Sequence, residues 1–306
     1  MANPLALILL TALLVLLFFL AFGFTGCQYL ARADDWPDDT TDETPPPQGP
    51  KYAEIIEGTP GFAAHWPMNE TIGATEAEVV GLPNLNAVYV GNVVPGNPSA
   101  FIQKDPGNFA PSIDGSSGYL EVPFSPLLNL ANGLPFSVEV WAKPAAALPE
   151  GIEQVLISSH HISAGGNHRG YEIAMIGTSG PHATVRGRVF SIDAPFVSNV
   201  DITPADGDDV AWRHIVLTHS GSGLAGDVLT LYVSVEGVAG TLINEEPDAQ
   251  YREVQAGGQG ERPLRFGAGH LQEGGPEKFF AGLIDEVAFY QTALGQTDVE
   301  LHFQAL

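Results

Sequence analysis

Basic residues are scarce in this sequence. Twelve Lys and Arg stand against 36 Asp and Glu among 306 residues, which gives a formal net charge of −24. Proteins that bind nucleic acid need clustered Lys and Arg to neutralise phosphates. The charge balance therefore excludes nucleic acid as a partner and favours a soluble module in an ion-rich exterior.

Cysteine is almost absent, because Cys27 is the one cysteine in the chain. No intrachain disulfide can form, and the thiolate clusters that hold structural zinc are excluded. A core must therefore be stabilised by packing, and 306 residues are enough for a sizeable one.

Catalytic motifs are also lacking. Glycoside hydrolysis needs two carboxylates facing one cleft, for example from alternate residues of a strand. The acids Asp285 and Glu286 are adjacent, so regular alternation would point them to opposite faces. The nucleophile elbow Gly-x-Ser-x-Gly does not occur. We therefore expect a protein that is not an enzyme.

A hydrophobic run at the N-terminus, residues 5–24, carries no charge and is long enough to span a bilayer as a helix. Phe24-Thr25-Gly26-Cys27 follows it and resembles the bacterial lipobox, in which the cysteine is lipidated. Residues 1–26 are then either a signal peptide that leaves Cys27 as a lipidated N-terminus, or an uncleaved transmembrane anchor. Both alternatives predict an extracytoplasmic domain attached to a membrane.

The segment 27–60 differs in composition. It contains Asp34-Asp35-Trp36-Pro37-Asp38-Asp39 and, a few residues later, three consecutive prolines, 45–47. Such a segment buries little apolar surface and its charges repel one another, so we expect a disordered, extended linker.

From residue 61 to residue 306 the pattern changes to short segments of alternating apolar and polar residues, separated by Gly, Pro, Asn and Asp. In 136–142 and in 229–235 the apolar residues occupy every second position. A stripe of Val299, Phe303 and Leu306 predicts one helix near the C-terminus. The remaining strands are expected at 63–68, 154–159, 171–176, 186–192, 212–219, 264–267 and 280–290. Strands without intervening helices predict an all-β, two-sheet antiparallel sandwich in one domain.

Several segments, in chain order, resemble the laminin-G-like, concanavalin A-like family of jelly rolls. They are 64–70 (AHWPMNE), 109–122, 136–141 (FSVEVW), 212–216 (WRHIV), 229–233 and 280–290 (FAGLIDEVAFY). The resemblance implies a jelly roll that binds glycans, proteins or calcium and rarely catalyses reactions on its own. Fold alone does not determine the function.

The resemblance also suggests a calcium site. Glu70 follows the first strand and Asp285 lies in the last, and the first and last strands of jelly rolls are often neighbours. Ca²⁺ prefers oxygen ligands such as carboxylates. The alternative is that Asp285 accepts hydrogen bonds from backbone amides and that Glu70 is solvated.

Trp141 and Tyr232 lie on the non-core side of their strands by alternation. Either ring could stack against a sugar in a ligand-binding site. Either could instead pack in a second layer on the outside of the sandwich.

These observations predict a membrane-tethered, extracytoplasmic module that recognises a glycan or a surface protein, with calcium as a possible cofactor. The alternative is a structural subunit of an envelope, appendage or virion, and a glycoside hydrolase is the weakest hypothesis. The loops that set specificity carry no shared motif, so the sequence does not name the ligand.

Overall fold

The computed structural model describes residues 50–71, 73–131, 133–163, 165–192, 197–221, 226–254, 261–271 and 275–306. Residues 49–306 form one compact unit. The predictions for the N-terminal apolar run, for Cys27 and for most of the linker lie outside the described residues. Within the described ranges, no helix is long and apolar enough to cross a membrane.

The first of two large sheets, sheet A, has nine strands in the described residues. They are β1 (Phe62–Trp66), β3 (Val80–Gly81), β5 (Val93–Pro98), β6 (Phe109–Asp114), β8 (Phe136–Pro144), β14 (Arg213–His219), β15 (Val228–Val235), β16 (Leu242–Pro247) and β20 (Ala281–Tyr290). The order is β16-β15-β14-β8-β20-β1-β3, and β6 pairs with both β20 and β5. The first and last long strands, β1 and β20, are therefore antiparallel neighbours.

Sheet B, the second large sheet, is also antiparallel. Its strands are β2 (Glu76–Ala77), β4 (Ala87–Val90), β7 (Tyr119–Val122), β9 (Glu153–Ser158), β10 (His161–Ile162), β11 (His168–Ile176), β12 (Thr184–Phe190), β13 (Val197–Ile202) and β17 (Leu264–Phe266). The order is β13-β12-β11-β9-β17-β7-β4-β2, with β10 beside β11. A small hairpin of β18 (Gly269–His270) and β19 (Pro276–Glu277) follows β17.

The core lies between the two sheets. Alternate residues of facing strands fill it, for example Val138 and Val140 of β8 and Ile173 and Met175 of β11. The sheets approach closely at Gly187 of β12, where a Cβ atom would lie 2.3 Å from Leu217 Cδ1. The predicted all-β, two-sheet antiparallel sandwich is confirmed.

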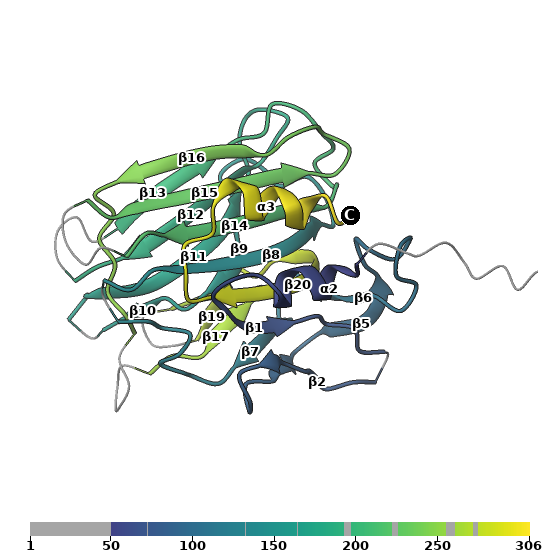
Figure 1. The fold of residues 1–306 in the computed structure, drawn as a ribbon, viewed down its shortest axis with the longest axis horizontal. Coiled ribbons are helices and arrows are strands. Elements are labelled where there is room, and N and C mark those ends of the chain that lie inside the picture. Colours follow the sequence, from purple (N-terminus) through teal and green to yellow (C-terminus); the bar gives the residue numbers. More distant parts are fainter. Residues whose placement is uncertain are drawn as a thin grey trace, which may run out of the picture. The chain divides into compact units, whose positions relative to one another are not determined.

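Two helices lie against the side of sheet A that faces away from sheet B, as Figure 1 shows. Helix α2 (Tyr52–Glu57) contacts β1, and helix α3 (Gln296–Phe303) contacts β15. The α3 helix was predicted from the sequence. The α2 helix was not: residues 52–57 fall in the segment predicted to be a disordered linker, and Tyr52 and Ile56 are buried. The linker prediction was therefore wrong for this part of 27–60, because two apolar side chains one turn apart suffice to dock a short helix.

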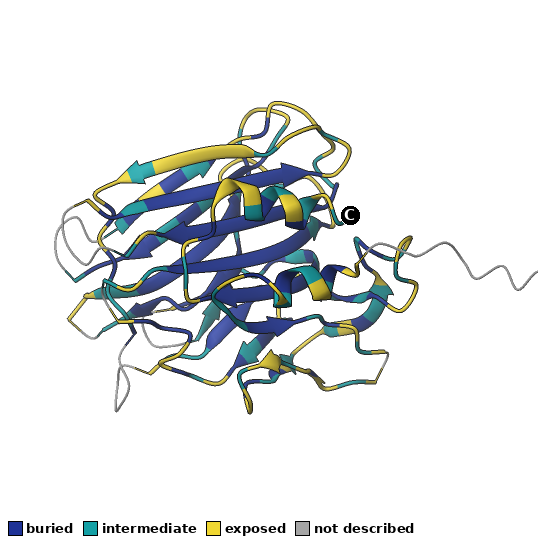
Figure 2. Ribbon diagram, viewed as in Figure 1, coloured by how far each residue is buried: buried dark blue, intermediate teal, exposed yellow. Residues whose placement is uncertain are grey.

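The strands differ clearly in how far they are buried (Figure 2). Strands β8, β14 and β15 are buried almost throughout, whereas most residues of the edge strand β16 are exposed. The sequence analysis missed β16 and β13, which carry polar residues at many positions because they lie at sheet edges.

Candidate functional site

The outer face of sheet A, the side away from sheet B, is covered by a second apolar cluster beneath the two helices. The cluster consists of Tyr52, Ile56, Phe101, Ala110, Trp141, Trp212, Val216, Tyr232, Ala288, Tyr290, Leu294 and Val299. It contains both predicted ligand-binding aromatics. Trp141 is fully buried, and Tyr232 is 7% exposed. Their positions match the second alternative of the sequence analysis, packing in a second layer outside the sandwich, because α2, α3 and neighbouring loops cover the outward-facing rings.

A buried polar network crosses this cluster and is centred on Glu139 of β8. Its Oε1 accepts hydrogen bonds from Tyr52 Oη (2.5 Å) and His214 Nε2 (2.6 Å), and its Oε2 accepts one from Tyr290 Oη (2.8 Å). His302 of α3 places Nδ1 at 3.1 and 3.0 Å from the two oxygens. One carboxylate thus connects α2, α3, β14 and β20 to β8.

The hydrogen bonds of the network determine where its protons lie. The hydroxyl of Thr59 donates its one proton to the carbonyl of Ile55, so it accepts from His302 Nε2 at 2.8 Å. His302 Nδ1 must then also carry a proton to donate to Glu139. Burial lowers the pKa of His302, but the charge of Glu139 outweighs burial and raises it above its usual value. Burial raises the pKa of Glu139, yet His302 and His214 hold it well below its usual value. A buried imidazolium–carboxylate pair results.

The ligand atoms of Glu139, His214 and His302 lie within 4.8 Å of one another, so the group could hold a metal ion. Two imidazoles and one carboxylate suit zinc rather than calcium. A metal would need the lone pair of His214 Nε2, and the proton would move to Nδ1, which is buried and has no partner in the described structure. With Nε2 as the donor to Glu139 Oε1 at 2.6 Å, the network needs no N–H at that Nδ1. We therefore interpret the group as a structural ion pair.

A second network lies on the same outer face, where β20 contains a bulge between Asp285 and Ala288. Glu286 adopts a φ of +48° there, which is uncommon for a residue with a side chain. Glu286 Oε2 bonds His65 Nε2 (2.5 Å), and its Oε1 accepts from Asn108 Nδ2 (2.6 Å). His65 Nδ1 contacts Glu57 of α2 at 3.1 Å. Regular alternation predicted opposite directions for Asp285 and Glu286, and the bulge is the reason that both instead lie among residues of the outer face.

The charge of Glu70 acts on Asp285, its predicted partner in a calcium site. Burial, followed by the charge of Glu286, raises the pKa of Asp285 well above its usual value, and the charge of Glu70 contributes. Asp285 Oδ1 accepts from the backbone of Glu286 at 2.9 Å, whereas Oδ2 is buried without a partner in the described residues. Glu70 accepts hydrogen bonds from Tyr89 Oη and from the backbone of Glu78, both at 2.8 Å. Among the described residues, the ligand atoms that lie within reach of one ion are those of Glu139, His214 and His302, and neither Asp285 nor Glu70 belongs to that group.

The outer face of sheet B is different, because a row of polar residues crosses it. The side chains alternate with those that fill the core, so they face outward. Neighbouring strands place the members of the row directly opposite one another, in the order Asn199, Arg188, Glu172, Ser158, Arg265, Glu121, Val88 and Glu76. Basic and acidic side chains alternate along most of this row.

Ion pairs connect these side chains and their neighbours. Arg186 donates from Nε and Nη2 to the two carboxylate oxygens of Asp201, at 2.7 and 2.6 Å. Arg188 contacts Glu153 at 2.5 Å and Glu172 at 3.2 Å. The Arg186–Asp201 pair is partly exposed, with 33% and 41% of the side-chain surfaces accessible. We call Arg186, Arg188, Asn199, Asp201 and Glu153 the polar patch.

The hairpin β18–β19 contacts the middle of the row. The Nη1 of Arg265 donates to the carbonyl of Gly269 at 3.3 Å, and His270 Nε2 contacts the carbonyl of Ser158 at 3.2 Å. Glu172 is buried here, and burial raises its pKa although the charge of Arg188 opposes the rise. The outer face is therefore accessible on both sides of this hairpin: at Arg186, Asn199 and Asp201 on β12 and β13, and at Glu76, Val88 and Glu121 on β2, β4 and β7.

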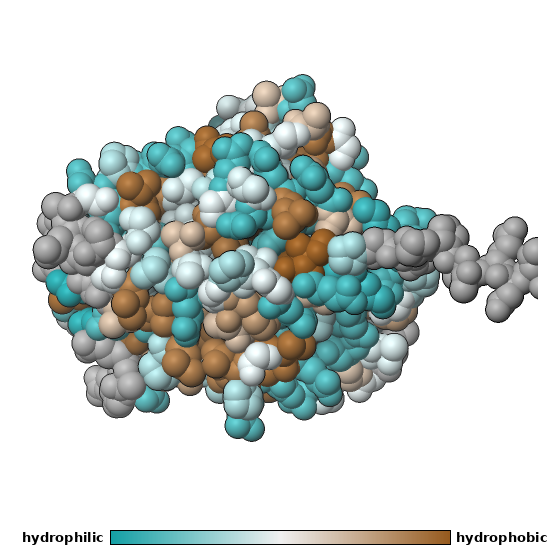
Figure 3. Space-filling view, viewed as in Figure 1, coloured by the Kyte–Doolittle hydropathy of each residue, from teal (hydrophilic) through white to brown (hydrophobic). Residues whose placement is uncertain are grey.

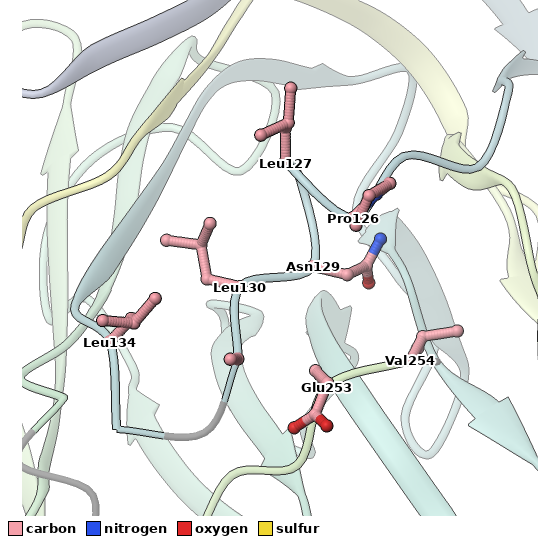
Figure 4. A pocket seen from close by; sticks show the side chains of 8 residues that line it. Pro126, Leu127, Asn129, Leu130, Leu134, Glu253 and Val254 are labelled. Carbon is pink, nitrogen blue, oxygen red and sulfur yellow. The ribbon is translucent and has the colours of Figure 1, made fainter. Parts of the chain in front are cut away.

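A pocket of about 550 Å³ lies elsewhere on the molecule (Figure 4). Leu127, Leu130 and Leu134 extend into it from one loop, and Glu253 and Val254 lie on another segment. The lining is mainly aliphatic and offers few groups that could bind hydroxyls. On the face seen in Figure 3, hydrophobic side chains form several groups separated by hydrophilic ones.

Sequence reasoning missed both the Glu139 network and the polar patch. A signal was present in each case. Glu139 shares the non-core face of its strand with Trp141, and a charged residue there among aromatics indicates a buried pair. Arg186 and Arg188 alternate on the predicted strand 186–192, but their partner Asp201 lies on β13, which was not predicted.

Solved structures resemble this fold. The binding domain of botulinum neurotoxin serotype D/C has a TM-score of 0.52 and 13% identity, over 82% of this chain and 53% of that one. The binding domain of Paraclostridial Mosquitocidal Protein 1 has a TM-score of 0.50 and 16% identity, over 81% and 52%. Domain 4 of AbnA, an extracellular arabinanase from Geobacillus stearothermophilus solved with arabinotriose, has a TM-score of 0.46 and 14% identity, over 79% and 97%.

This chain spans about half the length of the two toxin binding domains, and at these identities the likeness concerns the fold. No curated protein matches the sequence. A family model described as the concanavalin A-like lectin/glucanases superfamily matches residues 114–300, which is more than half of the chain. The chain therefore belongs to this laminin-G-type family of concanavalin A-like domains.

Proposed function

We propose that the protein is a glycan-binding module, tethered to a membrane by its N-terminus and exposed on the extracytoplasmic side. The observation that carries the proposal is the polar patch on the outer face of sheet B. Sugars are bound by several hydrogen-bonding side chains fixed on rigid elements. The patch supplies such groups from paired strands, whereas α2 and α3 cover the outer face of sheet A.

The geometry of the patch supports recognition of vicinal hydroxyls. Each ion pair offers donors and acceptors side by side, and a hydroxyl group can donate and accept at once. Arg186 and Asp201 hold each other in a bidentate arrangement, so little side-chain freedom is lost when a ligand binds. The side chain of Asn199 is exposed beside them.

A glycan array with the full-length protein in mild detergent tests this function. Saturable binding is expected, with at least a tenfold loss in an Arg186→Ala variant, which corresponds to about 1.4 kcal/mol. Lys51→Ala is the matched control, since it removes a base that pairs with Asp105 and lies next to α2. An array without any binding would remove the proposal.

We further propose that calcium binds at Asp285, with Glu70 nearby. The support is the buried Oδ2 of Asp285 without a partner in the described residues and the raised pKa of this carboxyl group. A cation there would favour the ionised form of this carboxyl group, which burial and the charge of Glu286 disfavour. The site lies next to α2 and away from the polar patch, so calcium would stabilise the fold rather than contact the glycan.

Thermal melting with excess calcium and with a chelator checks the calcium site. A ligand that binds only the native state stabilises it by RT ln(1 + [L]/Kd), about 2.7 kcal/mol at one hundred times Kd. The rise is expected in the wild type and lost in Asp285→Asn. An equal rise in both proteins would place any calcium elsewhere.

The tether remains a proposal based on sequence, either through lipidation of Cys27 or through a retained apolar helix. Radiolabelled fatty acid incorporated into the wild type and absent from Cys27→Ser would identify lipidation. Label in neither protein, with the apolar segment kept in the mature chain, would identify the anchor.

A packing subunit is the second candidate function, and the edge strand β16 favours it. Leu242 and Ile243 are exposed there, and in the described residues no further strand pairs with β16. Unpaired edges of sheets can join another chain. Light scattering over a range of protein concentrations would reveal a large assembly if this is the role.

A further inference from the structure

We infer that the polar patch selects uncharged glycans and discriminates against those that carry carboxylates or sulfates. The inference rests on the glycan-binding function proposed above and specifies its substrate class. It depends on how the guanidinium groups of this face are already engaged.

Arg186 cannot form a bidentate hydrogen-bonded pair with an acidic ligand. Its Nε and Nη2 both donate to Asp201. A ligand carboxylate would have to displace Asp201, and two carboxylates would then compete for one guanidinium. Bidentate pairing with a guanidinium is the arrangement that makes Arg effective toward carboxylates and phosphates.

The other arginines of the row are committed in the same way. Arg188 uses Nη2 for Glu153 and Nη1 for Glu172, and its Nε is buried. Arg265 donates from Nε to Glu121 at 3.0 Å and from Nη1 to a backbone carbonyl, and 6% of its side chain is accessible. Neither group is available to neutralise an incoming anion.

Among these ion pairs, acids outnumber bases by one. Four bases, Arg186, Arg188, Arg265 and Lys278, form ion pairs with five acids, Asp201, Glu153, Glu172, Glu121 and Glu277. No excess of positive charge remains to attract an anion. The whole chain carries −24, so its long-range field repels anionic glycans as well.

A neutral sugar hydroxyl can bind without displacing Asp201 from Arg186. Each carboxylate oxygen of Asp201 accepts one hydrogen bond from Arg186 and keeps a further lone pair. A hydroxyl can donate to that oxygen and accept from Nη1 of Arg186, which the pair with Asp201 does not use, without breaking the ion pair. Hydrogen bonds to charged groups are stronger than neutral ones, so this mode supplies affinity without a net charge on the ligand.

The test uses pairs of oligosaccharides that differ only at C6: glucose with glucuronate, and galactose with galacturonate. Binding to the full-length protein is measured by titration calorimetry at low and moderate salt. We expect the neutral member of a pair to bind at least tenfold more tightly than its uronate. Asp201→Asn should lower the affinity for the neutral sugar. It should raise the affinity for the uronate by roughly tenfold, because Nε and Nη2 of Arg186 are no longer held by a carboxylate.

Asp105→Asn is the control, since it also releases a base from a surface ion pair, but near the helix side. It should change neither affinity. Tighter binding of uronates by the wild type would overturn the selectivity and keep the glycan-binding function. If Asp201→Asn leaves the affinity for neutral oligosaccharides unchanged, the polar patch is not the site where they bind. Absence of binding to any member of the pairs or of the array would overturn the function itself.

Discussion

The two outer faces of the sandwich use charged residues in opposite ways. On sheet A, Glu139 and Glu286 are fully buried under α2 and α3, and each bonds a histidine. On sheet B, the pair of Arg186 and Asp201 is partly exposed to solvent. The described helices thus cover one face, while the other remains accessible beside the β18–β19 hairpin.

This difference separates structural from functional polar groups. A buried charge is costly unless paired, so the acids of sheet A are expected to be sensitive to any change. An exposed pair contributes little to stability, so Arg186 and Asp201 can take part in the binding proposed above without being needed for the fold. The predictions below test the contrast by matched acid-to-amide substitutions.

The largest effect is expected for Glu139→Gln. The amide removes the charge that compensates His302 and places an NH₂ group among donors from Tyr52 and Tyr290. Breaking a buried pair by removing one partner costs about 3–5 kcal/mol. Urea denaturation measures this loss. A cost below 1 kcal/mol would mean that the network does not hold the two helices.

Alkaline pH should also lower the free energy of unfolding, through the His65–Glu286 network on the outer face of sheet A. The pKa of His65 rises from 6.5 to about 9: burial lowers it, but Glu286 and Glu57 more than compensate. Because the folded-state pKa is raised, its stabilisation is complete below pH 6.5 and is lost as pH rises through about 9, on the order of 3 kcal/mol. Unfolding free energies from pH 6 to 10 should show the decline, and His65→Gln should reduce the slope. An unchanged slope in that variant would assign the decline to other groups.

The sandwich was predictable from sequence because alternation in strands such as 136–142 and 229–235 directly reports which side chains fill the core. The directions of Trp141 and Tyr232 were also correct. Their exposure was not predictable, because it depends on α2, a short helix in a segment whose acidic and proline-rich composition favours disorder.

The candidate site was less predictable than the fold. The pairing of the first and last long strands, on which the calcium prediction was based, is present, whereas the calcium site itself stays a prediction. The polar patch did not, since Arg186 and Asp201 are brought together by the register of β12 and β13, and β13 is a polar edge strand with a weak pattern. Ion pairs across strands depend on register, which no local pattern specifies here.

A smaller effect, of opposite sign, is expected for Asp285→Asn in the presence of a chelator. The amide cannot ionise beside Glu286 and Glu70, so at pH values above the raised pKa of the carboxyl group the variant should be more stable than the wild type, on the order of 1 kcal/mol. The wild type should lose stability as pH rises through the raised pKa of this carboxyl group, and the variant should not. Chelator melts over a pH series measure both, and a variant less stable at every pH would assign Asp285 a structural hydrogen-bonding role.

The smallest effect on stability is expected for Asp201→Asn, the same change as Glu139→Gln made on the open face. The pair with Arg186 is partly accessible on both sides, and such surface pairs contribute less than about 1 kcal/mol. The urea midpoint should therefore shift several-fold more in Glu139→Gln than in Asp201→Asn. Only Asp201→Asn should change glycan selectivity. If Asp201→Asn were as destabilising as Glu139→Gln, the pair would be a structural element of the sheet. The pair would then give no support to ligand binding on the outer face of sheet B.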